Sequence, residues 1–255
     1  MSWNPDQYLK FSAPRLRPAL DLLAAVPSSQ PATVYDLGCG AGNVTRLLAE
    51  RWPQADITGV DDSAPMLAKA ATELAGVRWV EQSVADWRAD RPADVIYSNA
   101  ALHWLPDHAR LFTALLAQLA PAGVLAAQMP RNFDAPSHVL INDTVRAGPW
   151  RARLEPMLKP SPVAAPEFYY DVLAPLAAHL DIWETEYLQV LAGADPVKEW
   201  TKGTWLKQFL DALDTPDRAP FEADYAARLR SAYPQRADGK TLFPFRRLFI
   251  VATAR

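Results

Sequence analysis

The fold class is decided by the stretch Thr33-Val34-Tyr35-Asp36-Leu37-Gly38-Cys39-Gly40-Ala41-Gly42-Asn43. Residues 33–37 form a short, mostly apolar run with β-branched and aromatic side chains, which is typical of a buried strand. Three glycines at alternate positions follow, and they allow a tight turn that a ligand can approach closely. A helix beginning at Asn43 would offer free N–H groups beside that turn. The stretch therefore predicts a strand, a ligand-binding turn and a helix.

Residues 33–129 repeat this alternation of short apolar runs and longer amphipathic stretches. We expect strands at Thr33–Leu37, Asp56–Val60, Val77–Glu81, Asp94–Ser98 and Val124–Gln128. Helices are expected at Phe11–Ala25, Asn43–Trp52, Ala64–Leu74 and His108–Leu119, and the first of them should bury a stripe of Leu16, Leu20 and Leu23. Such alternation is typical of βαβ units that close a parallel sheet.

The C-terminal half is richer in proline and mixes helical patterns with two extended runs. The runs are 181–191, expected to be a sixth strand, and 245–254, whose apolar centre predicts a buried final strand. The fold class is therefore an α/β sheet, mostly parallel with an antiparallel last strand, plus an inserted helical cap. We expect the core to comprise residues 1–130, 181–191 and 244–255, and the cap residues 131–180 and 192–243.

Composition excludes several classes of protein. The 255 residues carry 26 basic and 29 acidic side chains, a formal charge of −3, so a general affinity for nucleic acid is not expected. No apolar run approaches the length of a membrane span, and the first residues lack a basic stretch followed by an apolar one, so neither membrane insertion nor export is expected. The single Cys39 and the lack of a His or Cys cluster suit the reducing cytoplasm and predict no metal site. We expect a small-molecule partner; a monomer is compatible with the sequence, which does not determine the oligomeric state.

The residues in and around the glycine turn disfavour a dinucleotide as its ligand. A dinucleotide fingerprint would place its third glycine at position 43, which is Asn. Asp36 stands two residues ahead of Gly38, and an acid there favours a cationic ligand over a pyrophosphate. A structural turn with a capping Asp is the alternative. At the end of the second expected strand, Asp61 is placed to accept hydrogen bonds from both hydroxyls of a ribose.

An acid-led GxGxG turn of this kind resembles the S-adenosylmethionine-dependent methyltransferases with a Rossmann-like sheet. The resemblance implies S-adenosylmethionine as cofactor and the binding set Gln7, Tyr8, Asp36, Gly38, Gly40, Asp61, Met66, Ser83, Asp86, Trp87 and Asn99. For Met66 the alternative is a core position, and for Asp86 a solvated loop. Whether Ser83 or Asp86 meets the adenine stays open, because the register after the third strand is uncertain.

Segments outside the glycine turn resemble one particular family of these methyltransferases. They are 3–13, 99–108, 128–130, 169–171 with 181–183, and 245–252, and together they resemble the trans-aconitate 2-methyltransferases over essentially the whole chain. Membership implies methyl transfer to a carboxylate of trans-aconitate, giving a monomethyl ester. Two positions depart from the family pattern: Ser83 replaces an acid, and His103 stands where Gln is frequent.

The implied reaction needs no general base, because a carboxylate with a pKa of roughly 4 is already ionised at neutral pH. It needs cationic anchors for the carboxylates that do not react, and arginine provides bidentate contacts. The candidate substrate residues are His103, Trp104, Arg247, Arg131, Tyr170 and Arg15. Because side chains alternate along a strand, only one of Arg246 and Arg247 can point inward. The family resemblance implies that it is Arg247. Tyr8, Tyr169, Tyr170 and Trp200 either close the pocket or belong to the core.

Three alternatives remain at this point. The chain could methylate another small carboxylic acid or a malonyl thioester. It could be an NAD-dependent reductase, which Asp36 and Asn43 disfavour. It could also bind S-adenosylmethionine as a sensor without catalysis. For His103, a packing or orienting role is the alternative to general-base catalysis.

Overall fold

The computed structural model describes the backbone of residues 12–255 and the side chains of residues 16–255. The predictions for Gln7, Tyr8 and the side chain of Arg15 therefore lie outside the described residues.

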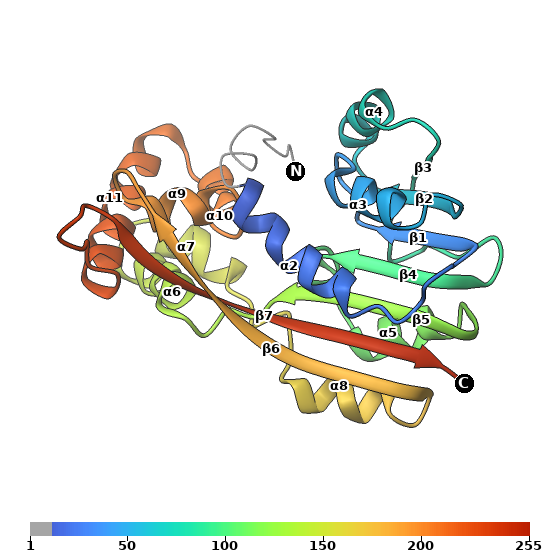
Figure 1. Cartoon of the computed structure of the whole chain (residues 1–255). Helices are drawn as coiled ribbons and strands as arrows, with labels where there is room; N and C mark the ends of the chain where they lie inside the picture. Colours follow the sequence, from blue (N-terminus) through green and yellow to red (C-terminus); the bar gives the residue numbers. More distant parts are fainter. Residues whose placement is uncertain (1–11) are drawn as a thin grey trace. The chain divides into compact units, whose positions relative to one another are not determined.

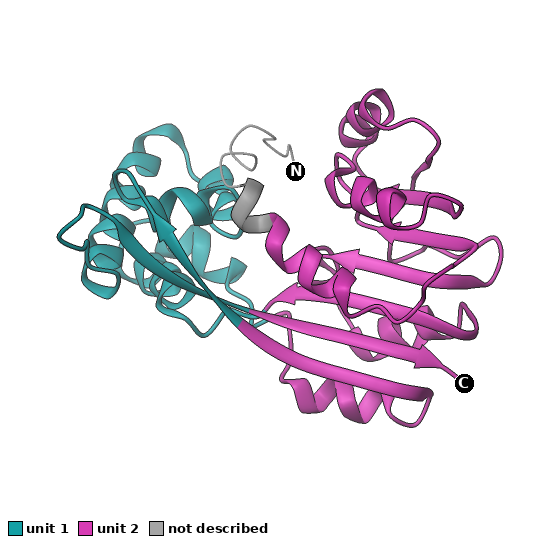
Figure 2. Ribbon diagram, viewed as in Figure 1, with its two compact units in different colours: residues 1–15, 131–161, 186–246 teal, residues 16–130, 162–185, 247–255 magenta. Residues whose placement is uncertain are grey.

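The chain folds into two compact units (Figure 2). The sheet unit comprises residues 16–130, 162–185 and 247–255. The helical unit includes residues 131–161 and 186–246. Strands β6 (Ala177–Leu191) and β7 (Thr241–Ala254) each begin in one unit and end in the other (Figure 1).

The seven-stranded sheet has the order β3-β2-β1-β4-β5-β7-β6. Its other strands are β1 (Thr33–Leu37), β2 (Asp56–Asp61), β3 (Arg78–Glu81), β4 (Ala93–Asn99) and β5 (Leu119–Pro130). The first five strands pair in parallel, and β7 runs antiparallel to β5. The predicted fold class is thus confirmed. Strand β1 has its predicted bounds and β3 begins one residue later than predicted, whereas β2, β4, β5, β6 and β7 extend beyond the bounds that their apolar centres predicted.

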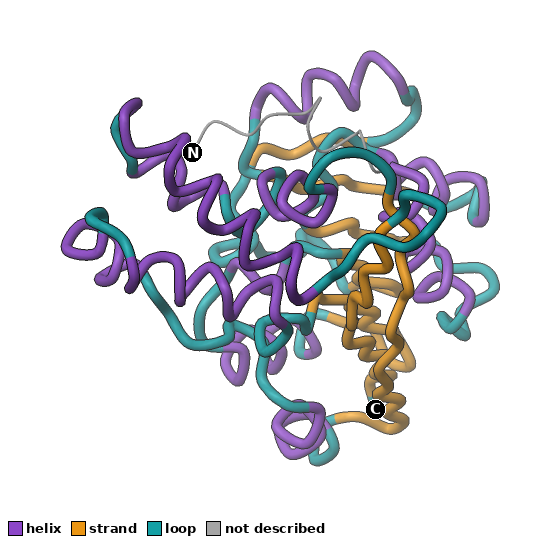
Figure 3. The backbone as a smooth tube through the Cα atoms, turned by 90° about the vertical axis from the view of Figure 1, so that its left-hand side faces the viewer, coloured by secondary structure: helices purple, strands orange, loops and turns teal. Residues whose placement is uncertain are grey.

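Helices flank the strands of the sheet unit (Figure 3). They are α2 (Ser12–Ala24), α3 (Asn43–Arg51), α4 (Ala64–Glu73), α5 (His108–Leu116) and α8 (Pro166–Leu173), with a short 3-10 turn at Leu102–Trp104. The stripe predicted for the first helix is wrong at Leu20, which is 44% exposed. The buried face instead contains Ala19 and Leu22, and the Tyr97 hydroxyl donates to the Ala19 carbonyl oxygen at 2.6 Å.

The predicted domain boundary differs from the observed grouping at α8. Residues 131–180 were expected to lie in the cap, but residues 162–185 group with the sheet unit. The reason is a buried polar and aromatic contact between α8 and α5: the Tyr169 hydroxyl lies 2.6 Å from His108 Nδ1, and the Tyr169 ring packs edge-on against Phe112. Burial lowers the pKa of His108, so this contact is made by a neutral imidazole.

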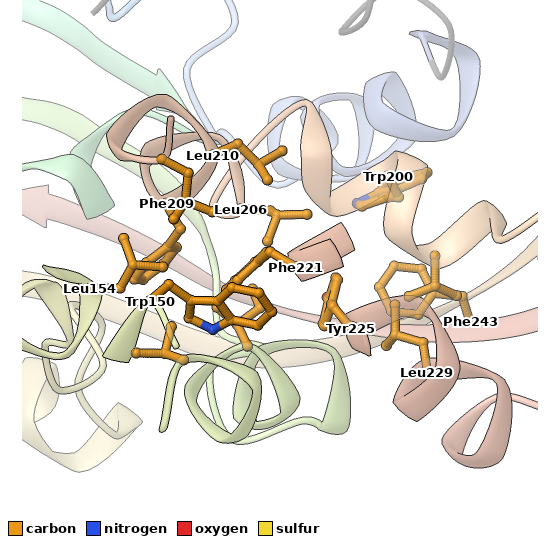
Figure 4. Packing of buried hydrophobic residues seen from close by; sticks show 14 of the residues in the cluster. Trp150, Leu154, Trp200, Leu206, Phe209, Leu210, Phe221, Tyr225, Leu229 and Phe243 are labelled. Carbon is orange, nitrogen blue, oxygen red and sulfur yellow. The ribbon is translucent and has the colours of Figure 1, made fainter. Parts of the chain in front are cut away.

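The helical unit has its own core. Its helices are α6 (Pro136–Ala147), α7 (Arg151–Leu154), α9 (Pro196–Lys202), α10 (Lys207–Ala212) and α11 (Thr215–Ala232), with a 3-10 turn at Glu155–Met157. Figure 4 shows large side chains from these helices and from β7 packed together, among them Trp150, Trp200, Phe221 and Phe243. Trp200 is therefore a core residue. That the helical unit acts as a substrate cap stays a prediction.

Within residues 12–255, no helix combines the length and the apolar character needed to cross a lipid bilayer.

Candidate active site

The glycine turn after β1 has the backbone geometry that its sequence predicts. Gly38, Gly40 and Gly42 all have positive φ, at 73°, 54° and 78°. The amides of Gly38 and Cys39 both donate to the Val60 carbonyl oxygen, at 2.8 and 3.1 Å, which fixes the turn against the end of β2. The turn is therefore a rigid part of the sheet edge.

The turn also requires glycine for reasons of space. A Cβ at Gly38 would lie 2.1 Å from the Ala101 Cβ, so the segment after β4 approaches the turn at backbone distance. At Gly40, in contrast, a Cβ would meet no atom within 4 Å. Gly38 therefore packs against the protein, whereas Gly40 faces open space where a ligand can approach the backbone.

Asp36 is almost completely buried at the end of β1, with 1% of its surface exposed. Its Oδ2 accepts a hydrogen bond of 2.6 Å from the Thr45 hydroxyl on α3. Burial, partly opposed by that bond and reinforced by the nearby charge of Asp61, raises the pKa of Asp36 to about 7. A cation placed beside this carboxyl group would stabilise its ionised form.

Asp61 ends β2 and organises the turn. Its Oδ2 accepts from the Gly40 amide at 2.8 Å, and its Oδ1 accepts from the Ser63 amide at 3.0 Å. Burial raises the pKa of Asp61, although both of these bonds lower it. Each carboxylate oxygen has a second lone pair, so the predicted bonds to ribose hydroxyls remain compatible with this geometry. Met66, in the first turn of α4, is half-buried.

Asn99 ends β4 with a buried and unsatisfied acceptor. Its Oδ1 is inaccessible to solvent and has no hydrogen-bond partner in the structure. The next residue, Ala100, has a positive φ of 55°, and its amide donates to the Gln128 carbonyl oxygen at 2.9 Å. The sharp bend at Ala100 carries the following segment toward Gly38 and leaves the Asn99 side chain at the sheet edge.

Arg247 is the buried member of the Arg246–Arg247 pair, with 5% of its surface exposed. Its Nη1 donates to Gln128 Oε1 at 3.2 Å. Arg246 points the other way and lies 3.6 Å from a carboxylate oxygen of Asp134, with its side chain 38% exposed. The alternation expected along the last strand is therefore observed.

Strand register places five of these polar side chains on one face of the sheet. Asp36 pairs with Gly59 and with Tyr97, Asn99 pairs with Gln128, and Gln128 pairs with Phe249. Paired residues share a face, as do residues two apart on one strand. We call the resulting set the polar row, in sheet order: Asp61, Asp36, Asn99, Gln128 and Arg247.

The polar row changes character across the sheet. It runs from two carboxyl groups through two amides to a guanidinium, over the strands β2, β1, β4, β5 and β7. One end suits a cation and the other an anion. The sequence indicates Gln128 only as part of the family-like segment 128–130, because a lone Gln inside an apolar strand gives no local signal of function.

The segment after β3 supplies the remaining predicted cofactor residues. The Ser83 hydroxyl oxygen accepts a bond of 3.3 Å from the Ala85 amide, and Asp86 is exposed. Trp87 is buried, and its ring packs edge-on against that of Tyr35 with centroids 4.9 Å apart. Within the part of the chain that the structure describes, no hydrogen bond joins Ser83, Asp86 or Trp87 to the polar row.

The predicted substrate residues occupy different environments. His103 is buried in the 3-10 turn after β4, and its ring lies 4.6 Å from that of Trp104, which is 49% exposed. Tyr170 on α8 is 59% exposed. Arg131 belongs to the helical unit, where its amide donates to the Arg246 carbonyl oxygen at 3.0 Å.

Comparison with known proteins places the chain in a family. A family described as a methyltransferase domain matches residues 34–123. The trans-aconitate 2-methyltransferase of Azoarcus sp. (strain BH72) is 50% identical over 98% of both chains. The chain belongs to the trans-aconitate 2-methyltransferase family. Members from Rhodopseudomonas palustris (strain BisB18) and Yersinia pestis (strain Pestoides F) are 46% and 44% identical, over 98% and 99% of this chain and 98% of each relative.

Solved structures agree with this family at the level of the fold. The YcgJ protein from Bacillus subtilis superposes with a TM-score of 0.57 over 92% of this chain and 97% of that one, at 16% identity. Phosphoethanolamine N-methyltransferase 2 from Haemonchus contortus, solved with S-adenosyl-L-methionine, gives 0.55 over 94% of this chain and 53% of that one, at 15% identity. Membership of the trans-aconitate 2-methyltransferase family confirms the predicted class, an S-adenosylmethionine-dependent methyltransferase.

Proposed function

We propose that this chain transfers the methyl group of S-adenosylmethionine to a carboxylate of trans-aconitate, giving a monomethyl ester and S-adenosylhomocysteine. The polar row is the observation that carries the proposal, because one sheet edge offers carboxyl groups for a cationic donor and a buried guanidinium for an anionic acceptor. The 50% identity to a curated member of the family supports the choice of substrate.

The carboxyl end of the polar row fits the methyl donor. Asp36 and the unsatisfied Asn99 Oδ1 are acceptors suited to the ammonium group of its methionine part, and Asp61 is suited to its ribose hydroxyls. The open space in front of Gly40 leaves room for close approach to the backbone. When bound, S-adenosylmethionine supplies a methyl group on a positively charged sulfur, and transfer leaves a neutral thioether.

The residues of the chain then act by positioning and by removing water. The acceptor carboxylate arrives ionised, so no side chain has to take a proton from it. Because an anion and a cation lose their charges together in this transfer, a dry pocket that removes water from the carboxylate favours the reaction. Arg247 anchors a carboxylate that does not react, and the segment after Asn99 holds His103 and Trp104 at the same sheet edge.

The test is a radiolabelled methyl-transfer assay with trans-aconitate, other small di- and tricarboxylic acids, and a malonyl thioester. We expect the highest kcat/KM with trans-aconitate. In Arg247→Ala, KM for trans-aconitate should rise by about 10- to 100-fold, as for loss of a hydrogen-bonded charge, with KM for S-adenosylmethionine changed much less. A preference for the thioester, or equal changes in both KM values, would contradict the proposal.

Two finer points remain proposals. A small-molecule acceptor without a nucleic-acid partner is supported by the net charge of −3. Location in the cytoplasm is supported by the single Cys39, which is buried.

A further inference from the structure

Gln128 has an unsatisfied hydrogen-bond donor at the centre of the sheet edge. The residue is 0% exposed on β5. Its Oε1 accepts from Arg247 Nη1, whereas its Nε2 is inaccessible to solvent and has no partner. Leaving a buried amide donor unpaired costs about 1–3 kcal/mol, so such a group in a folded protein calls for an explanation.

The orientation of the Gln128 amide is fixed by chemistry. A guanidinium group only donates hydrogen bonds, so the amide atom that faces Arg247 must be the oxygen. The amide cannot exchange its two ends without placing N–H against N–H. The unpaired NH2 group is thus held in place by Arg247.

The neighbours of Gln128 define what this NH2 group would bind. Arg247 on β7 places a buried positive charge beside it, so an anionic acceptor is favoured over a neutral one. On the other side, Asn99 presents an unsatisfied oxygen, which requires a hydrogen-bond donor, and an ionised carboxylate has none to offer. The boundary between the site for the cationic donor and the site for the anionic acceptor therefore lies between Asn99 and Gln128.

We propose that Gln128 determines acceptor specificity by donating, through Nε2, to a carboxylate that does not react, the same carboxylate that Arg247 anchors. This inference rests on the proposed carboxyl methyltransferase function. The reacting carboxylate is a poorer fit, because an oxygen held by two strong donors is less nucleophilic. Gln128 and Arg247, joined by their mutual hydrogen bond, together form a clamp that selects acceptors with a second carboxylate.

Two substitutions separate this role from a purely structural one. Gln128→Met removes both amide functions at similar volume. Gln128→Glu keeps, and strengthens, the oxygen that faces Arg247, but it replaces the donor by a negatively charged oxygen. Gln118→Met is the matched control, because the amide of Gln118 is satisfied within the sheet unit by the Ala89 amide and the Ala114 carbonyl oxygen.

We expect Gln128→Met to raise KM for trans-aconitate by about 10- to 100-fold, as for loss of a hydrogen bond to a charged group. Gln128→Glu should raise it further, because its carboxylate repels the acceptor. The affinity for S-adenosylhomocysteine, measured by calorimetry, should change by less than about 3-fold in both variants, which also reports that the sheet edge is folded. Gln118→Met should leave both quantities unchanged.

Two outcomes would overturn the inference. If Gln128→Glu retains the KM of the unaltered protein, Gln128 only positions Arg247. If Gln128→Met weakens S-adenosylhomocysteine as much as trans-aconitate, Nε2 belongs to the donor site. Failure of the proposed function can be distinguished from failure of this inference, because the unaltered protein would then transfer no methyl group to trans-aconitate. In that case calorimetry of trans-aconitate with the S-adenosylhomocysteine complex decides: weaker binding in Gln128→Met supports the clamp, and equal or absent binding contradicts it.

Discussion

The two units bury polar groups in opposite ways. In the helical unit, Trp150 Nε1 donates to the Thr144 carbonyl oxygen at 2.8 Å, and the Tyr225 hydroxyl donates to the Ser137 carbonyl oxygen at 2.6 Å. At the edge of the sheet unit, the polar row contains buried amide atoms without partners and an Asp36 carboxyl group whose pKa burial raises to about 7. The first arrangement stabilises a fold by itself, whereas we propose that the second is completed by a ligand.

This difference predicts that substitutions in the two units affect different measurements. Changes in the helical core should lower stability and leave donor affinity unchanged. Changes in the polar row should alter ligand affinity. Removal of a polar group that has no hydrogen-bond partner should not destabilise the unliganded protein. The five predictions below test this separation, from the largest expected effect to the smallest.

The largest effect is expected from Phe221→Ala in the helical core. Phe221 is fully buried, and its ring packs edge-on against Trp150 with centroids 5.1 Å apart. Removing the ring should cost about 3–5 kcal/mol of unfolding free energy through lost burial and a cavity. Thermal or urea unfolding measures the loss, with Phe221→Leu as a milder control. A parallel loss of S-adenosylhomocysteine affinity under folded conditions would break the proposed separation.

Gly38→Ala should have the next largest effect, now on the ligand. The new methyl group would meet Ala101 at 2.1 Å, and alanine is strained at a φ of 73°. We expect the turn to shift and donor affinity to fall by at least ~10²-fold, since strain of about 1–3 kcal/mol adds to the clash. The double variant Gly38→Ala with Ala101→Gly relieves the clash alone and should recover part of the affinity in calorimetry. No recovery would mean that backbone strain dominates.

Asp36 should make donor binding depend on pH. The carboxyl group has a pKa of about 7 without ligand, and a bound ammonium group favours the ionised form. Below pH 7 binding must therefore release a proton, and S-adenosylhomocysteine affinity should fall by about tenfold between pH 8 and 6. Calorimetry over this range measures the slope, and Asp36→Asn should abolish it. Since Asp61 also has a raised pKa, a slope that persists in Asp36→Asn would assign the proton to Asp61.

Asp36 should also make the stability of the unliganded protein depend on pH, in the direction opposite to that of donor affinity. Its pKa in the fold is higher than its usual value of 3.8, so between about pH 4 and 7 the unliganded fold binds one proton more than the unfolded chain. Stability contributed by this group is therefore lost as the pH rises through that window. In Asp36→Asn this loss should be absent, and the melting temperature of the unliganded protein should vary less with pH.

The smallest effect is expected from His103→Gln. His103 is buried beside Trp104, and the proposed reaction needs no general base. Because an essential base contributes about 10²- to 10⁴-fold to rate, a decrease in kcat of less than ~10-fold would support a packing or orienting role. Loss of more than ~10²-fold in a folded variant would show that the imidazole transfers a proton.

Much of the sheet unit could be predicted because its signals are local. The glycine turn, the acid ahead of it and the acid after β2 each lie within a few residues of a strand end, where spacing and backbone chemistry identify them. Alternation along the last strand limited the inward position to one of Arg246 and Arg247, the family resemblance favoured Arg247, and the burial of Arg247 agrees. The grouping of α8 with the sheet could not be predicted, because it depends on the contact between Tyr169 and His108 from distant segments.

The sequence by itself determined the class of the fold, the glycine turn and the type of ligand that an acid-led turn favours. Those properties follow from short-range sterics, periodicity and charge. Only the tertiary structure assembled Asp61, Asp36, Asn99, Gln128 and Arg247 into one row, because that requires the register of five strands. Two of the four neighbouring pairs, β1 with β4 and β5 with β7, are far apart in the sequence. That the Gln128 Nε2 donor has no hydrogen-bond partner is likewise a result of packing. An amide is polar in any sequence, but only the folded structure shows which of its atoms is buried without a partner.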